Sequence, residues 1–145
     1  MKEASNGRAR RRHALWSLAA ALAAVVVLAP TAAVAQPLPS NELAIAGQAD
    51  YISGGQIAVY ITVKGIGGFG FVDINVQQPQ PFGTTFGNGG QQVFCDGRRH
   101  TYAVSIFYNG GPPFQLGEAL ATGQVFCPSP ATAGTDSQTI RITKP

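Results

Sequence analysis

The chain has 145 residues, of which 45% are hydrophobic and 12% are charged, and its formal net charge is +3. Five of the ten Lys and Arg residues lie before His13, so the chain from Gln36 onward carries five cationic and six anionic side chains, a net charge of −1. This near-neutral balance excludes binding to nucleic acids and other polyanions by charge alone. The remaining length of about 110 residues is enough for one small domain with a single core.

A signal peptide is predicted for residues 1–35. Its cationic head precedes residues 14–29, an uncharged run rich in Ala, Leu and Val that is expected to be helical. The small residues Ala33 and Ala35 then suit a cleavage site, so Gln36 becomes the new N-terminus. The alternative is an uncleaved membrane anchor, but this run of about 16 residues is shorter than the roughly 20 of a spanning helix. We therefore expect a secreted protein without membrane insertion after cleavage, exported by the general route in preference to the twin-arginine route.

Two cysteines remain after cleavage, and we expect them to form one disulfide, Cys95–Cys127. An oxidising compartment permits the bond, and two cysteines allow one intramolecular pairing. In the chain-entropy model, closing a loop of about 30 residues gives roughly 3–4 kcal/mol of stabilisation. A free thiol is the alternative. A metal site fits poorly, because His100 is the one histidine in this part of the chain and four ligands are usual. No metal or other cofactor is expected.

The sequence beyond the signal peptide alternates between apolar and polar side chains with a period of two, which indicates β-strands. The alternation is clearest over residues 57–63, and no later segment has a helical period. An extended leader is expected at 36–42 and a single β-domain at 43–145. Turn signals separate the strands, and their number favours an immunoglobulin-like antiparallel sandwich, with a small barrel as the alternative. The strands are expected at 43–51, 57–63, 71–76, 93–95, 102–108, 119–127 and 139–143.

The segment 77–91 interrupts this pattern and is predicted to be a long loop. It is rich in Gln, Gly and Asn, and Pro79 and Pro81 argue against a central strand because proline cannot donate to a strand ladder. Loops on rigid sandwiches often carry binding residues. The alternative is that the loop aromatics fold back and close one end of the core. The residues predicted for a binding loop are Phe82, Phe86 and Phe114.

No constellation for catalysis stands out in the sequence. His100 could act as a base with Asp96 as its orienting partner, but no nucleophile motif such as G-x-S-x-G accompanies them. The carboxylates are scattered singly, whereas glycosidases need a converging pair. The glycines between residues 65 and 70 lack the Lys-Ser/Thr pair of a phosphate-binding loop. We therefore expect a protein that is not an enzyme.

The second half of the chain carries a recognisable series of features: Cys95-Asp96-Gly97, His100, the strand 102–107, Gly111-Pro112-Pro113-Phe114, Gly117, the alanine-rich strand 118–121, Cys127 and the strand 139–142. In these features the chain resembles small secreted immunoglobulin-like proteins common in actinobacteria, which have no established function. The resemblance covers about the last 50 residues, and the first half shares the strand pattern alone. Relatives often have a cysteine in an early strand, whereas residues 50–53 have none here. The resemblance implies a fold and provides no catalytic residue.

Two functions of different classes follow from this reading. The first is an extracellular binding module, monomeric, that presents its loops to a protein or a glycan. The second is a carrier that holds a small apolar ligand between its sheets, because the alanine and glycine face of residues 118–125 would leave room. An enclosed apolar cavity of a few hundred Å³ would favour the carrier. A filled core with exposed aromatics would favour the binding module.

Overall fold

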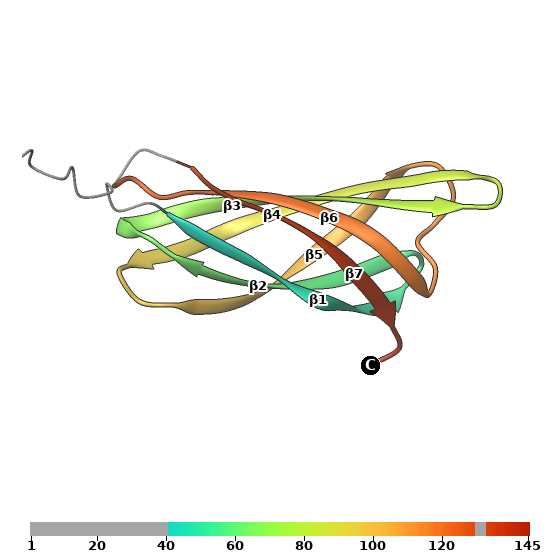
Figure 1. The fold of residues 1–145 in the computed structure, drawn as a ribbon, viewed down its shortest axis with the longest axis horizontal. Coiled ribbons are helices and arrows are strands. Elements are labelled where there is room, and N and C mark those ends of the chain that lie inside the picture. Colours follow the sequence, from blue (N-terminus) through green and yellow to red (C-terminus); the bar gives the residue numbers. More distant parts are fainter. Residues whose placement is uncertain (1–40, 130–132) are drawn as a thin grey trace, which may run out of the picture. The chain divides into compact units, whose positions relative to one another are not determined.

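The computed structural model describes residues 41–129 and 133–145 (Figure 1). The described residues form no α-helix, and among them no helix could cross a membrane. The prediction of an all-β domain with seven strands is confirmed. The predicted signal peptide, its cleavage site at Ala35 and Gln36, and most of the leader lie outside the described residues. The strands are β1 (Glu42–Ser53), β2 (Gln56–Lys64), β3 (Ile66–Gln80), β4 (Gly83–Asp96), β5 (His100–Gly110), β6 (Gly117–Phe126) and β7 (Gly134–Thr143).

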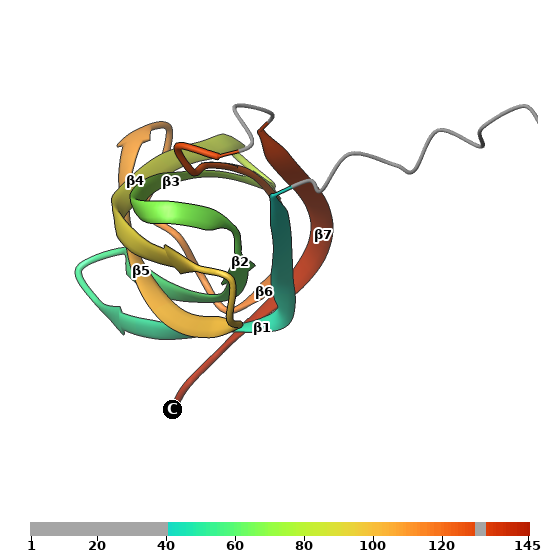
Figure 2. The same cartoon turned by 90° about the vertical axis from the view of Figure 1, so that its left-hand side faces the viewer.

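The seven strands close into one barrel in the order β1-β2-β5-β4-β3-β6-β7, as Figure 2 shows in a view along the strands. All neighbouring pairs are antiparallel except β1 and β7, which pair in parallel and close the ring. The expected immunoglobulin-like sandwich would have two separate sheets, whereas the strands of the structure are hydrogen-bonded into one closed barrel. The barrel was the alternative expectation. Two junctions join strands that would otherwise belong to two sheets: the β3–β4 hairpin, whose strands have 15 and 14 residues, and the parallel pairing of β1 with β7.

The prediction of a loop at 77–91 is wrong, because this segment forms the outer half of the β3–β4 hairpin. The pairing continues to Gln80↔Gly83, so Pro81 and Phe82 make the turn. Pro79 is tolerated because the pairing of β3 with β6 ends at Gln77. Beyond that point one edge of β3 has no neighbouring strand, and a missing N–H on that edge breaks no ladder.

The barrel interior is filled by the inward-facing residues of every strand. Val and Ile dominate because branched side chains suit the pleated, half-buried surface of a strand. Phe114, in the connection between β5 and β6, is the largest fully buried side chain. The core residues that are at most 1% exposed are Ala49, Ile57, Val59, Ile61, Val63, Val72, Ile74, Val76, Val93, Cys95, Val104, Ile106, Phe114, Ala121, Val125, Ile140 and Ile142.

The predicted disulfide Cys95–Cys127 is present, with the two Cα atoms 5.9 Å apart. Cys95 lies on the inner face of β4 and Cys127 follows the last residue of β6. Strand β3 lies between these two strands in the barrel, and the bridge passes Gly70 of β3. A β-carbon at position 70 would lie 2.6 Å from the Cys95 sulfur, so a glycine here leaves the space that the bridge occupies.

Candidate binding surface

The three phenylalanines predicted for a binding loop have different environments. Phe82 lies in the β3–β4 turn and is 97% exposed, and Phe86 lies on the outer face of β4 and is 45% exposed. Phe114 is 1% exposed, so the prediction that it belongs to an exposed loop surface is wrong. Its ring fills the space above Gly87, where a β-carbon would lie 2.6 Å from Phe114 Cε2. Phe114 thus closes one end of the core, whereas Phe82 projects into solvent from the turn of the β3–β4 hairpin.

Buried polar contacts hold this hairpin against the segment 111–116. The Gln78 side chain donates to the carbonyl of Gln115 and accepts from its N–H, both at 2.9 Å. Thr85 Oγ1 donates to the carbonyl of Pro112 at 2.8 Å. Thr85 is fully buried and Gln78 is 3% exposed, and such buried bonds are strong because water does not compete for them. The hairpin is therefore fixed to the barrel up to its turn.

A group of half-exposed phenylalanines lies on the outer face of β4, β3 and β6, and we call it the phenylalanine patch. Phe69 pairs across strands with Phe94, with ring centroids 4.7 Å apart, and Phe71 pairs with Phe126. Half of four phenylalanine surfaces amounts to roughly 400 Å² of exposed apolar area. The largest apolar patch on a typical monomer is about 300–600 Å² and is often functional, so a contiguous patch of this size is a candidate interaction site. The members of the patch are Phe69, Phe71, Phe94 and Phe126, which are 55, 48, 51 and 47% exposed.

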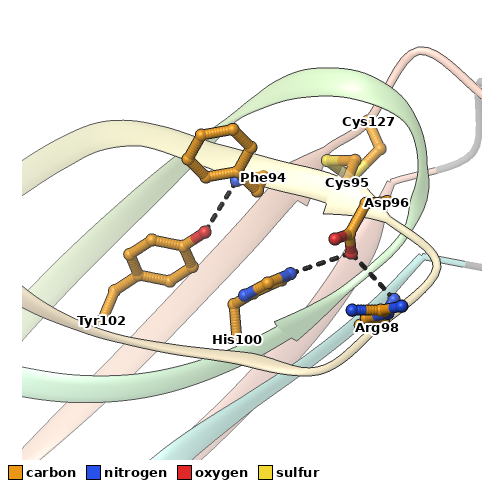
Figure 3. A network of polar contacts seen from close by, with 7 residues as sticks. All are labelled: Phe94, Cys95, Asp96, Arg98, His100, Tyr102 and Cys127. Carbon is orange, nitrogen blue, oxygen red and sulfur yellow. Dashed lines mark hydrogen bonds and ion pairs between the residues drawn. A yellow bond between two sulfur atoms is a disulfide. The ribbon is translucent and has the colours of Figure 1, made fainter.

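A polar network continues the patch toward β5 (Figure 3). Tyr102 Oη accepts the backbone N–H of Phe94 at 2.7 Å, and His100 Nε2 lies 2.8 Å from Asp96 Oδ1. The His100 ring lies near those of both Phe94 and Tyr102, with centroids 6.2 and 6.4 Å away. Backbone pairing of β4 with β5 is confined to residues 86–88 of β4. These side chains therefore connect the two strands where their backbones have separated.

The predicted pair of His100 and Asp96 exists, but its surroundings favour a structural role. Asp96 Oδ1 also accepts the backbone N–H of Arg98 at 2.9 Å, which fixes the turn between β4 and β5. Among the described residues, no Ser, Thr or Cys side chain makes a hydrogen bond with His100. The pKa of Asp96 is lowered below its ordinary value of 3.8. The main cause is the hydrogen bond with the His100 side chain, and the second is the hydrogen bond from the backbone N–H of Arg98.

This lowered pKa predicts a pH-dependent contribution to stability. A carboxyl whose pKa is lower in the folded state stabilises the protein above its unfolded pKa, and the contribution is lost as the pH falls through the folded value. At neutral pH the wild type should therefore unfold at a higher temperature than Asp96→Asn, and the two midpoints should converge between about pH 5 and pH 2. Thermal unfolding of both proteins across that range checks this. A difference that stays constant with pH would show that the charge of Asp96 is not responsible.

A shallow polar hollow of about 550 Å³ lies beside the phenylalanine patch on β3, β6 and β7. Gln124 is two residues from Phe126 on β6 and pairs with Thr135 of β7, and Thr122 pairs with Asn75 of β3. The cross-strand register therefore places an amide and hydroxyl surface next to the Phe71–Phe126 pair. The residues of this polar hollow are Asn75, Thr122, Gly123, Gln124, Thr135, Asp136 and Ser137.

The inner face of β6, where a carrier would need room, is closely packed. Ala119 and Ala121 are 2% and 0% exposed. The missing side chain of Gly123 leaves a space that its neighbours occupy: a β-carbon there would lie 2.5 Å from Ile74 Cδ1 and 3.0 Å from Leu43 Cδ2. The space that these small residues leave is therefore filled by larger core side chains such as Ile74 and Leu43.

Comparison with known proteins does not assign a role to this surface, so its role has to be inferred from its geometry. No protein-family model and no curated protein matches the sequence. Within residues 41–129 and 133–145, no three His, Cys, Asp or Glu side chains lie together as metal ligands would. The signal that sequence reasoning missed is the recurrence of phenylalanine at outward strand positions. Whether those positions meet depends on strand register.

Proposed function

We propose that this chain is a secreted, non-enzymatic binding module that contacts its partner through the phenylalanine patch. The observation that carries this proposal is the half exposure of all four rings on a face of paired strands. Keeping four phenylalanines partly in water forfeits hydrophobic stabilisation, and a partner that covers them would recover it. The strand backbone holds the rings in place before binding, so little conformational entropy is lost on association.

An immunoglobulin-like ancestry is part of the proposal, and the strand order supports it. The run β1-β2-β5-β4 has the order of strands A-B-E-D of an immunoglobulin domain, and β3-β6-β7 has the order C-F-G. The disulfide departs from the usual B–F bridge, because Cys95 and Cys127 connect β4 with the end of β6. With this order, the resemblance to small secreted actinobacterial proteins remains our preferred assignment.

Secretion is supported by two independent features. The N-terminal 35 residues have the charge, apolar run and small-residue site of a cleavable signal. The disulfide is typical of proteins that fold in an oxidising compartment. We propose that cleavage after Ala35 releases the mature domain outside the cytoplasm, where its partner is an extracellular protein or glycan.

The double variant Phe71→Ala/Phe126→Ala tests the binding role. It should retain the fold, because both side chains point outward, and should lose most of the material that the immobilised wild type captures from culture supernatant and envelope extract. An anchor residue at the centre of an interface contributes about 1–2 kcal/mol or more, so removing two should reduce capture at least about tenfold. The measurement is the amount captured at equal loading, with circular dichroism as the check on folding.

Phe107→Ala is the matched control for this experiment. Phe107 lies on β5, is 58% exposed and is outside the phenylalanine patch. Its replacement removes the same side chain from another part of the outer surface and should leave capture unchanged. Equal capture by the double variant and the wild type would show that the phenylalanine patch is not the contact surface.

A further inference from the structure

We infer that the phenylalanine patch and the polar hollow form one site, and that its ligand is an uncharged polysaccharide. The inference rests on the proposed binding function and names the chemistry of the partner. The two surfaces adjoin, because Phe126 and Gln124 are successive outward residues of β6 and Phe71 pairs directly with Phe126. Together they offer flat apolar rings beside amide and hydroxyl groups.

The exposed rings of Phe71 and Phe126 suit the C–H faces of sugar rings. The face of a phenylalanine ring is electronegative and its neighbours on that face are preferentially electropositive hydrogens. A pyranose presents such hydrogens on one face and hydroxyl groups around its edge. Phe71 and Phe126 are register partners on adjacent strands and are each about half exposed, so a sugar ring that stacks on either ring covers surface that is otherwise in contact with water.

The side chains of the polar hollow match the hydroxyl groups of the same ligand. Gln124, Thr122, Thr135 and Ser137 are exposed, and amide and hydroxyl side chains both donate and accept hydrogen bonds, as sugar hydroxyls do. The three strands span roughly 10 Å at the usual strand spacing.

The charges around the site favour a neutral ligand. No Lys or Arg lines the polar hollow, so a phosphate or uronate has no cationic partner there. Asp136 lines it, and its carboxylate accepts the backbone N–H groups of Ile45 and Ser137 at 2.7 and 2.8 Å. Asp73 adjoins it, since it pairs with Gln124 across the strands. These two carboxylates would repel an anionic chain.

The pairing of β6 argues against an extended peptide as the ligand. Peptides that bind to sheets commonly add a strand at a free edge. Strand β6 pairs with β3 on one side and with β7 on the other along the whole of the polar hollow. At β6 the site therefore offers side chains and no backbone edge, which suits a ligand recognised by stacking and by hydroxyl hydrogen bonds.

Co-sedimentation with insoluble polysaccharides tests the inference. The probes are microcrystalline cellulose, chitin and granular starch, with cross-linked polygalacturonate as the anionic comparison. The wild type should be retained by at least one neutral polysaccharide and not by polygalacturonate. Phe126→Ala and Gln124→Ala should each weaken that retention about tenfold, the effect of removing one anchoring contact. The matched controls Phe107→Ala and Gln138→Ala, at exposed positions outside the site, should be retained like the wild type.

Two outcomes would overturn the inference: no retention on any of the three neutral polysaccharides, or equal retention of Phe126→Ala and Phe107→Ala. The result of the capture experiment with Phe71→Ala/Phe126→Ala then separates the two proposals. If that variant still loses its extracellular partner, the phenylalanine patch binds a partner of another class and the polysaccharide assignment alone fails. If capture is also unchanged, the binding role of the patch fails with it.

Discussion

Replacing both cysteines, Cys95→Ala/Cys127→Ala, is expected to lower the free energy of unfolding by roughly 3–4 kcal/mol. The two residues are 32 positions apart, and opening that loop raises the entropy of the unfolded chain. Most small domains are stable by about 5–15 kcal/mol, so the loss is a large share of the total. Both sulfurs also belong to the buried core, and their removal leaves β4 and the end of β6 without a covalent connection across β3.

Denaturant unfolding of the wild type and the double variant measures this difference. The wild type in the presence of a reducing agent is the control, because it opens the same bond without changing any side chain apart from the two thiols. The double substitution and the reduction of the wild type should both shift the unfolding midpoint to a lower denaturant concentration. A midpoint that is unaffected by reduction would contradict a stabilising role for the bridge.

The strands with strict alternation could be predicted from the sequence. Residues 57–63 and 102–108 place Val and Ile on one face, and each segment lies within a strand, β2 (9 residues) and β5 (11 residues). The disulfide was predictable for a different reason, since the chain has two cysteines and each therefore has a single possible intramolecular partner. In these cases the local sequence pattern and the tertiary structure favour the same arrangement.

Segment 77–91 shows why the long hairpin could not be predicted. Its inward positions carry Gln78, Thr85 and Gly87, none of which is a typical core residue. They face inward because Phe114 and the carbonyl groups of the segment 111–116 are there to receive them. A polar residue with a buried partner looks the same in a sequence as a residue in solvent, and the partners lie about thirty residues away.

Barrel closure was the alternative to the preferred sandwich, and the phenylalanine patch was not predicted, for a related reason. Phe71 stands in a strand whose other outward residues, Asp73 and Asn75, are polar, a pattern that on its own indicates an ordinary solvent-facing surface. Register brings Phe71 opposite Phe126 and Phe69 opposite Phe94. Register and closure depend on how far each strand extends, which single-strand periodicity does not determine.

Phe114→Ala is expected to lower the free energy of unfolding by about 3–5 kcal/mol, whereas Phe82→Ala should change it by less than about 0.5 kcal/mol. Phe114 is 1% exposed and packs on the glycine at position 87, so its removal leaves a cavity at the end of the core. Phe82 is 97% exposed in the turn of the same hairpin, so its ring has almost no contacts to lose. The two substitutions delete the same group from opposite environments.

Denaturant unfolding curves of the two variants measure the contrast, with an unchanged slope as the sign that stability alone has changed. Phe114→Leu is the graded control: it retains much of the buried volume and should lose less stability than Phe114→Ala. If Phe114→Ala were as stable as Phe82→Ala, the end of the barrel would not depend on this ring. The buried contacts of Gln78 and Thr85 would then hold the hairpin alone, because they join it to the segment that carries Phe114.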